Sequence, residues 1–481
     1  MKAGKRRGSV GAGLSSCCTA LLGLALLGWG LAGGGWAGEP PRLLWLTATT
    51  EADPEGTSLR PPFDPALAHY GVACGEEDLL QLRFGAPPGL RLGVDGVQPQ
   101  PGPESGAATA VAWGDVVTVR VAADSGAYRD YLIRCLPPSL AALRPTVPDG
   151  TAPPDTLLAV VAGDWLAVLD GHGAARFAQR VDGSGGGAGF FLRPFLVGGE
   201  LRWTHARRDG TAQSSWEWVV RDQDFQVVRV VKTAPPLTHT GRHDFRLLGD
   251  GSALLLAHEP AVRDLSHLGA VGATDGDGQP WGANVQVRDS VIQLLGPEGR
   301  VRWNWSSWGR IPLEDCTQHW FPGNYAHLNG LQWTERGVLA SFRGCSTVLL
   351  LDPGAPPGQE ILWRLGESNL APEEWGSRGL GPGPLTVVGD PLGGFCGQHG
   401  AQMLESGNLL LFDNGVSCVV DPRTGEPLMR RGGNTAERWN TSWIRRRAWP
   451  GSSGRGPCTM PRAPWGCGAA MWRHCRMAVG W

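Results

Sequence analysis

Charged residues are scarce in this sequence: Asp, Glu, Lys and Arg make up 18% of its 481 residues, and the formal net charge is −2. So small a net charge gives no indication of a nucleic-acid partner, which would require a basic surface. The 11 cysteines include no Cys-x-x-Cys pair and no other metal-ligand spacing. Beyond residue 38 no apolar run approaches the ~20 residues of a membrane-spanning helix. Nucleic-acid binding, a cysteine metal site and a membrane span are therefore disfavoured.

Glycine (72), proline (38) and tryptophan (22) are abundant instead, a mixture typical of a turn-rich all-β protein and too apolar for general disorder. The first 38 residues differ from the rest. A basic start, Lys2 to Arg7, precedes the apolar run Leu21–Leu31 and a small-residue site at residues 36–38. We interpret residues 1–38 as a cleaved secretory signal rather than a membrane anchor, which predicts a secreted or periplasmic protein without a stable membrane span.

Short β-rich runs between Pro/Gly turns occupy residues 43–137 and predict about seven strands arranged as a β-sandwich. Cys74 and Cys135 lie near its two ends and could form a disulfide, although spacing alone fixes no pairing. The landmarks of this segment resemble the cadherin-like β-sandwich repeat: Phe63-Asp64-Pro65, Tyr70-Gly71-Val72 and a closing Tyr131-Leu132-Ile133. We expect it to be a spacer or docking domain without chemistry of its own.

The most informative stretch follows residue 325. Two apolar runs, Gly337–Phe342 and Thr347–Leu351, predict a hairpin, and the run that begins at Ile361 predicts one further strand. Ahead of them, His327 and Asn329 should share one face of an extended segment, because side chains alternate along a strand. Four antiparallel strands within about 45 residues are typical of one blade of a β-propeller.

The same pattern recurs around His243 and around His399, where a histidine again precedes a glycine-centred turn and an aliphatic strand. Residues 156–182 predict three more strands and residues 189–233 a further set of four. Residues 260–286, rich in Gly and Asp, are predicted to be an inserted loop. We therefore expect a propeller over residues 150–429, with histidines of three blades converging on its central channel.

The last segment, residues 430–481, has a different composition: ten Arg, one acidic residue, six Trp and no Leu. It could be a basic tail that binds anionic surfaces. We favour the interpretation that it is an aberrant or disordered end, because nothing in it could build a core. On that interpretation the last blade of the propeller is incomplete.

Taken together, these motifs resemble the arylsulfate sulfotransferase family, which transfers sulfuryl groups without a nucleotide donor. The resemblance spans roughly residues 150–425 and rests on five stretches, which are His243-Asp244-Phe245, Tyr325 to Asn329, Ser341-Phe342-Arg343, Trp363 to Gly366, and Gln398-His399 with Leu411 to Gly415. It implies a six-bladed propeller, here with an incomplete sixth blade, behind the N-terminal β-sandwich. It also implies an aryl sulfate donor, a phenolic acceptor, no cofactor and no metal, and it leaves a homodimer open.

The resemblance also assigns roles to residues. His399 matches the family's nucleophile, which is transiently sulfated, and His243, His327, Asn329 and Arg343 match the residues that hold the sulfuryl oxygens. The chemistry suits these types, because a neutral imidazole can attack sulfur and later release the group. A guanidinium offers paired donors to an oxyanion. One departure is Gly400, which stands where the family usually has an acidic residue and removes an expected partner of His399.

Two other interpretations remain open from the sequence. Three imidazoles that converge in a channel can bind zinc, although Arg343 beside them favours an anion over a cation. Alternatively, the propeller is a non-catalytic module that binds a phenolic or sulfated ligand, or a protein, through the same face. Trp363 and Arg364 are expected to pack in an outer strand.

Overall fold

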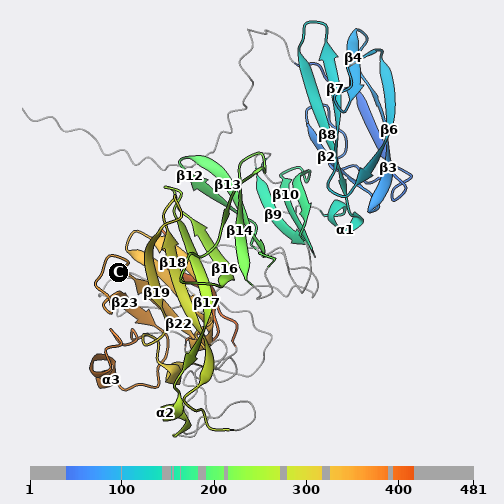
Figure 1. Cartoon of the computed structure of the whole chain (residues 1–481). Coiled ribbons are helices and arrows are strands. Elements are labelled where there is room, and N and C mark those ends of the chain that lie inside the picture. The colour runs from blue at the N-terminus through green and yellow to red at the C-terminus, as the bar shows by residue number, and fades with distance from the viewer. Residues whose placement is uncertain are drawn as a thin grey trace, which may run out of the picture.

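The computed structural model describes residues 40–98, 100–143, 153, 156–162, 164–181, 191–210, 215–270, 279–316, 325–387 and 394–415. The predicted signal at residues 1–38 and the predicted tail at residues 430–481 lie outside the described residues. Within those residues the protein is all-β, as predicted: it consists of largely antiparallel sheets with a few short helices (Figure 1). The helical segments are α1 (Pro138–Ala141), α2 (Ser266–Gly269), α3 (Pro372–Ser377), η1 (Leu313–Asp315) and η3 (Arg343–Cys345).

Two N-terminal sheets, blue to teal in Figure 1, are formed by eight strands that enclose one hydrophobic core. The first sheet has the order β1-β3-β6 and the second the order β2-β8-β7-β4-β5, in which β2 and β8 are parallel. Their bounds are β1 Trp45–Thr49, β2 His69–Ala73, β3 Glu77–Gly85, β4 Leu90–Val94, β5 Gln100–Pro101, β6 Glu104–Ala112, β7 Val116–Ala123 and β8 Tyr128–Leu136.

Alternation along β3 shows why this segment pairs as it does. Leu80, Leu82 and Phe84 are buried while the residues between them are exposed, the pattern of a strand with one face on a core. The landmark tyrosines Tyr70 and Tyr131 are fully buried in the same core. The possible link between the two ends of the segment is confirmed, because Cys74 and Cys135 form a disulfide.

A three-stranded sheet of order β11-β10-β9 follows, with β9 at Leu157–Ala162, β10 at Trp165–Asp170 and β11 at Ala175–Arg180. These are the three strands predicted for residues 156–182. Trp165 of β10 meets Trp113 edge to face at 6.0 Å, and the Arg134 side chain donates to the carbonyl of Gly114 at 2.9 Å and to that of Ala175 at 3.2 Å. The N-terminal sheets are therefore packed directly against this sheet.

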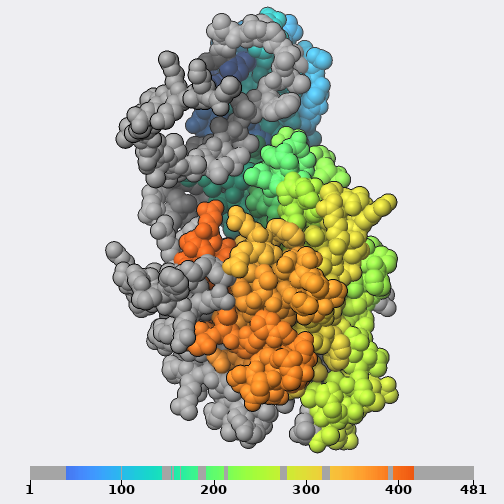
Figure 2. Space-filling view, turned by 90° about the vertical axis from the view of Figure 1, so that its left-hand side faces the viewer, coloured from blue at the N-terminus to red at the C-terminus, as the bar shows by residue number. Residues whose placement is uncertain are grey.

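Three four-stranded antiparallel sheets come next, green to orange in Figure 1, and a two-stranded sheet ends the described chain. In each of the three, the strands are paired in sequence order. The bounds are β12 Arg193–Val197, β13 Glu200–Arg208, β14 Trp216–Arg221, β15 Val227–Val231, β16 Thr240–Leu247, β17 Ala253–Arg263, β18 Val285–Leu295, β19 Val301–Ser306, β20 Leu328–Thr334, β21 Gly337–Phe342, β22 Thr347–Leu351, β23 Ile361–Leu365, β24 His399–Met403 and β25 Leu409–Phe412. Figure 2 shows the orange and yellow segments in contact over one face of the molecule.

The predicted hairpin agrees with the structure residue for residue, since β21 and β22 begin and end where the apolar runs do. The predicted inserted loop at residues 260–286 is wrong at both ends. Pro260 to Arg263 continue β17 and pair with Val285 to Arg288 of β18. Beyond Ala257, β17 has no paired residue of β16 on its other side, so Pro260 can occupy the strand although it lacks an N–H donor.

The extended segment predicted for His327 and Asn329 also needs correction. His327 lies just ahead of β20 with a positive φ of 47°, so strand alternation does not relate it to Asn329. The reason is local: the Arg343 N–H donates to the carbonyl of His327 and the Gly344 N–H to that of Ala326, both at 3.0 Å. These bonds hold the chain in a turn against η3.

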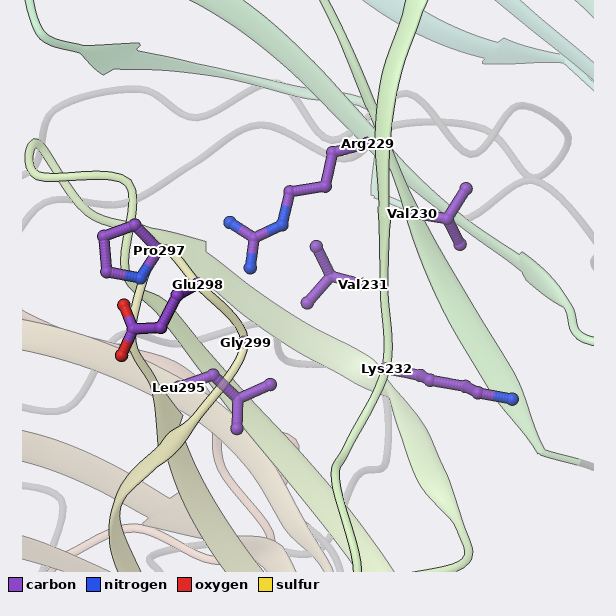
Figure 3. Close-up of a pocket in the computed structure, with 8 residues that line it drawn as sticks. All are labelled: Arg229, Val230, Val231, Lys232, Leu295, Pro297, Glu298 and Gly299. Atoms are coloured by element: carbon purple, nitrogen blue, oxygen red, sulfur yellow. The ribbon is translucent and has the colours of Figure 1, made fainter.

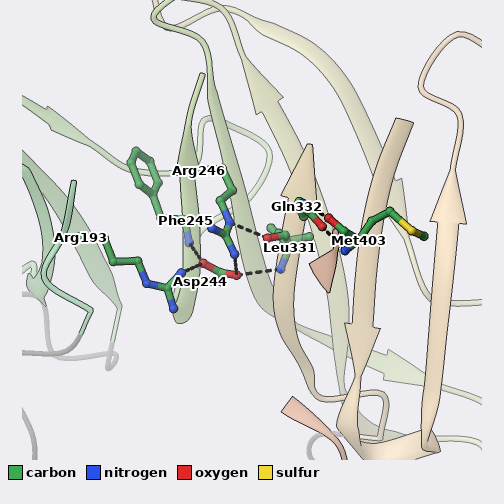
Figure 4. Close-up of polar contacts among 7 residues, drawn as sticks. All are labelled: Arg193, Asp244, Phe245, Arg246, Leu331, Gln332 and Met403. Atoms are coloured by element: carbon green, nitrogen blue, oxygen red, sulfur yellow. Dashed lines mark hydrogen bonds and ion pairs between the residues drawn. The ribbon is translucent and has the colours of Figure 1, made fainter. Parts of the chain in front are cut away.

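Side chains link the first strand of each sheet to the first strand of the next (Figure 4). Arg193 of β12 binds Asp244 of β16, whose carboxylate accepts from the Leu331 N–H of β20 at 2.8 Å. The amide of Gln332, also on β20, bonds to both the N–H and the carbonyl of Met403 in β24. The strands β12, β16, β20 and β24 are therefore fastened one to the next.

Two disulfides, Cys74–Cys135 and Cys316–Cys345, are compatible with an extracellular or periplasmic protein. The second of these pairs was not predicted. Among the described residues no helix has the length and apolar character needed to cross a membrane.

Candidate functional site

Four histidines gather where β16, β17, β20 and β24 meet. The ring centres of His243 and His327 are 4.9 Å apart, and each lies 5.9 Å from that of His258. His399 acts electrostatically on both His243 and His327, so it belongs to the same group. We call His243, His258, His327 and His399 the histidine cluster.

His243 is placed by an irregularity in β16. The pairing with β17 is interrupted between Thr240 and Phe245, so the segment that holds His243 leaves the regular ladder. A side chain at Gly241 would collide with Leu256 of β17, which explains why glycine is needed at this close approach. His243 is half-buried, and the neighbouring Asp244 is almost fully buried.

His327 and Arg343 are brought together by the turn between Tyr325 and Leu328 and by the helical turn η3. The Cys316–Cys345 disulfide closes a separation of 29 residues directly beside Arg343. A side chain at Gly344 would meet the Tyr325 carbonyl, so this close contact also requires glycine. The backbone bond from the Arg343 N–H to the His327 carbonyl then fixes the two residues relative to each other.

Asn329 lies on β20 and is 5% exposed. Its side-chain nitrogen donates to the Gln398 carbonyl at 2.7 Å, which ties β20 to the residue before His399. Its side-chain oxygen is buried and has no hydrogen-bond partner among the described residues. Gln398 is held in turn, because its own side-chain nitrogen donates to the Thr347 carbonyl at 2.9 Å and to Ser341 Oγ at 3.2 Å.

His399 is the first residue of β24 and pairs with Phe412 of β25. Its Nδ1 lies 2.7 Å from the side-chain nitrogen of Asn414. Asn414 also donates to the Gly397 carbonyl. Sequence reasoning expected His399 to lack an orienting partner because of Gly400, whereas the structure supplies one from the end of β25.

Every imidazole of the cluster is held in its neutral form. Burial, followed by the charge of Arg343, lowers the pKa of His399 to about 4. Burial, then Arg242 and His399, lowers the pKa of His243 to about 4. Burial and the neighbouring His243 and His258 lower the pKa of His327 to about 2. Near neutral pH these rings are therefore uncharged.

The charge of the site is consequently set by arginine. Arg343 is half-buried and acts on three of the four histidines, and burial lowers its own pKa without removing its charge near neutral pH. Asp244 is the carboxylate that acts on His243, and its charge is already engaged by Arg193 and Arg246. Neutral rings around a guanidinium provide hydrogen-bond donors and positive charge, which suits an anion.

The structure thus places all five predicted site residues in one region, namely His243, His327, Asn329, Arg343 and His399. Among the described residues, no group of three or more His, Cys, Asp or Glu side chains has a geometry that could hold a metal ion. Trp363 and Arg364 lie in β23, the last strand of its sheet; Arg364 is buried over the Trp375 ring and donates to the Arg310 carbonyl at 2.9 Å.

Sequence reasoning missed His258 and the role of Asn414. His258 lies inside an aliphatic strand and lacks the repeated position of the other histidines, so only its contacts identify it. Asn414 stands in a stretch that was recognised, but 15 residues after His399, a separation that indicates no contact by itself. A strand pair was needed to show that they meet.

A separate hollow of about 250 Å³ lies on the surface between β15 and the turn from β18 to β19 (Figure 3). Its polar lining comes from Arg229, Lys232 and Glu298, and none of the four histidines contributes to it. It is therefore distinct from the histidine cluster.

No family model matches this chain, and no curated protein matches it in sequence. The assignment of a function consequently depends on the residues of the cluster and their chemistry.

Proposed function

We propose that this protein is a sulfotransferase that moves a sulfuryl group from an aryl sulfate ester to a phenolic acceptor through a sulfated His399. The observation that supports it most is the environment of His399: a neutral imidazole, held at Nδ1 by Asn414, in the field of Arg343. A nucleophile for sulfur needs a free lone pair on nitrogen, and a cation beside it can neutralise the sulfate oxygens.

The arrangement of the sheets is consistent with the β-propeller that this proposal includes, preceded by a β-sandwich. Three four-stranded sheets have the same strand order, and β12, β16, β20 and β24 are linked in series by side chains. In a propeller the first strand of each blade lines the central channel. The histidine cluster would then lie on the channel axis. A small aromatic substrate would reach it from the extracellular or periplasmic medium.

The first half-reaction is nucleophilic displacement at sulfur. The Nε2 lone pair of His399 forms the N–S bond while the S–O bond to the aromatic ring breaks, and the phenolate leaves with the electron pair. The Nε2 lone pair is free in the tautomer that has its proton on Nδ1. This tautomer requires a half-turn of the Asn414 amide, so that its oxygen faces Nδ1 and its bond to the Gly397 carbonyl is given up. We assign the binding of the sulfuryl oxygens to the donors of Arg343, His243 and His327. Asn329 has one side-chain N–H left for them, because its nitrogen also donates to the Gln398 carbonyl.

The second half-reaction reverses the first. The oxygen of an acceptor phenol forms a bond to sulfur, and its proton passes to a neutral imidazole of the cluster. The N–S bond breaks and its electron pair returns to Nε2. Transfer of the sulfuryl group from the donor ester to the acceptor phenol therefore has ping-pong kinetics.

The test is phenol release from 4-nitrophenyl sulfate by the full chain, together with intact-mass detection of a sulfuryl adduct. We expect one equivalent of nitrophenol and an adduct in the wild type, and neither in His399→Asn. The control is His172→Asn, which changes an exposed histidine in the turn between β10 and β11 and should behave as the wild type. Equal bursts from wild type and His399→Asn would reject this nucleophile. Binding of the donor with no release from the wild type would favour the non-catalytic binding module.

A further inference from the structure

His258 is a polar side chain in the cluster to which the proposed mechanism gives no part. It lies on β17 directly after five leucine and alanine residues that are fully buried. Both of its ring nitrogens are shielded from solvent and have no hydrogen-bond partner among the described residues. A buried imidazole with an unused donor and an unused acceptor is costly, and such groups in native proteins commonly have a catalytic role or bind a water or ion.

Its position relative to the other rings is well determined. His258 pairs with Ser290 of β18, and the hydroxyl of Ser290 accepts from the Leu328 N–H at 3.1 Å. This contact fixes the backbone next to His327. The ring centres of His258 and His327 are 5.9 Å apart. Two imidazoles joined by an N–H···N bond of about 3 Å have their centres about 5 Å apart, so a small rotation brings the rings into hydrogen-bonding distance.

The charges around His258 differ from those around its neighbours. The neighbouring groups whose charges lower the pKa of His258 are His243 and Arg288. By contrast, Arg343 and His399 lower the pKa values of both His243 and His327. His258 therefore lies behind the other two rings, farther from the cation that would hold the sulfuryl group. A proton shared with His258 lies farther from Arg343, the cation that would bind the sulfuryl oxygens, although Arg288 acts on it there.

The proposed reaction needs such a proton. A phenolate leaves in the first half-reaction and a phenol must lose its proton in the second, so the protein lends one proton and recovers it. Arg343 is too weak an acid, and the His399 nitrogen is occupied by the sulfuryl group. Asp244 is held by Arg193 and Arg246. The remaining imidazoles of the cluster are the groups that can donate and later accept this proton.

We propose that His258 is a relay residue, which shares with His327 and His243 the proton that protonates the leaving phenolate and is later returned by the acceptor phenol. This inference rests on the proposed function and adds a positioning residue to it. The bound donor brings a negative charge beside the rings, which favours uptake of one proton from solvent. As the S–O bond breaks, that proton passes to the phenolic oxygen and leaves the rings neutral. When the acceptor oxygen bonds to sulfur, its proton returns to them.

The test compares donors whose phenols differ in acidity. Nitrophenolate is a good leaving group that needs no proton, whereas the phenolate from phenyl sulfate is more basic and gains from protonation. In His258→Phe, which keeps a ring of similar size without nitrogens, the rate of adduct formation from phenyl sulfate should fall by at least about tenfold. The rate from 4-nitrophenyl sulfate should change by less than about twofold. The exposed His172→Asn serves again as the matched control.

The outcomes separate this inference from the proposed function. A His258→Phe protein that slows equally with both donors, or with neither, overturns the relay while His399 remains the nucleophile. A wild type that forms no adduct with either donor overturns both. If His258→Phe does not fold, His258→Asn decides the same question, because an amide keeps a donor and an acceptor but takes up no proton.

Discussion

The buried carboxylate of Asp244 should hold β16 and β20 together, and replacing it with asparagine tests this directly. Its side chain is 3% exposed and accepts from Arg193 Nη1 at 2.7 Å, Arg246 Nη2 at 3.1 Å, the Leu331 N–H at 2.8 Å and the Phe245 N–H at 2.8 Å (Figure 4). Asn keeps the shape and one acceptor oxygen. It removes the charge that balances two guanidinium groups.

The size of the effect follows from burial. Removing one partner of a buried ion pair costs about 3–5 kcal/mol, because the other charge stays desolvated. Arg193 remains 31% exposed and can recover some hydration, so we expect the lower part of this range, about 3 kcal/mol for Asp244→Asn. The matched control is Asp124→Asn, which breaks a surface pair with Arg91 in which the aspartate is 75% exposed. It should cost no more than about 1 kcal/mol.

Urea unfolding followed by tryptophan fluorescence measures both variants, and the buried Trp218, stacked on Phe245 at 4.9 Å, reports on the same region. The same carboxylate holds the segment of β16 that carries His243. Asp244→Asn should therefore also disturb the position of His243 and weaken binding of an aryl sulfate. A loss of stability for Asp244→Asn no larger than that of Asp124→Asn would refute the argument that this carboxylate fastens the two sheets.

Three further predictions concern the site. Replacing Cys316 and Cys345 with serine should lower the free energy of unfolding by about 2–4 kcal/mol, measured by urea unfolding. It should also weaken binding of the aryl sulfate donor, measured by calorimetry, because the disulfide lies beside Arg343. Unchanged binding would show that η3 holds Arg343 without the disulfide. Asn414→Ala should slow adduct formation about tenfold with little change in stability, and rates equal to wild type would remove its orienting role. Because burial lowers the pKa values of the cluster histidines to about 4 or below, the unfolded chain binds more protons between that pH and the usual histidine pKa. Stability should therefore be complete above about pH 6.5 and fall towards pH 4, which thermal unfolding can follow; a flat profile would contradict the burial of neutral rings.

Local pattern was sufficient for much of the fold. The all-β class, the strands β9 to β11 and the ends of β21 and β22 could be predicted, because alternation and turn residues act over a few neighbours. The loop predicted for residues 260–286 failed for the opposite reason. Proline disfavours a strand because it lacks an N–H donor. Pro260 is accommodated in β17 because β16 has no residue paired with it on the side away from β18.

For the candidate site, the sequence by itself determined the residue types: a histidine that recurs in three successive units, with one asparagine and one arginine in the middle unit. The tertiary structure decided which of them meet and in what state. The turn that sets His327 against Arg343 depends on a disulfide and on Gly344, and the neutral state of the rings depends on burial by several sheets at once. His258 and Asn414 join the site through strand pairing, and contacts between residues distant in the chain leave no periodic signal in it.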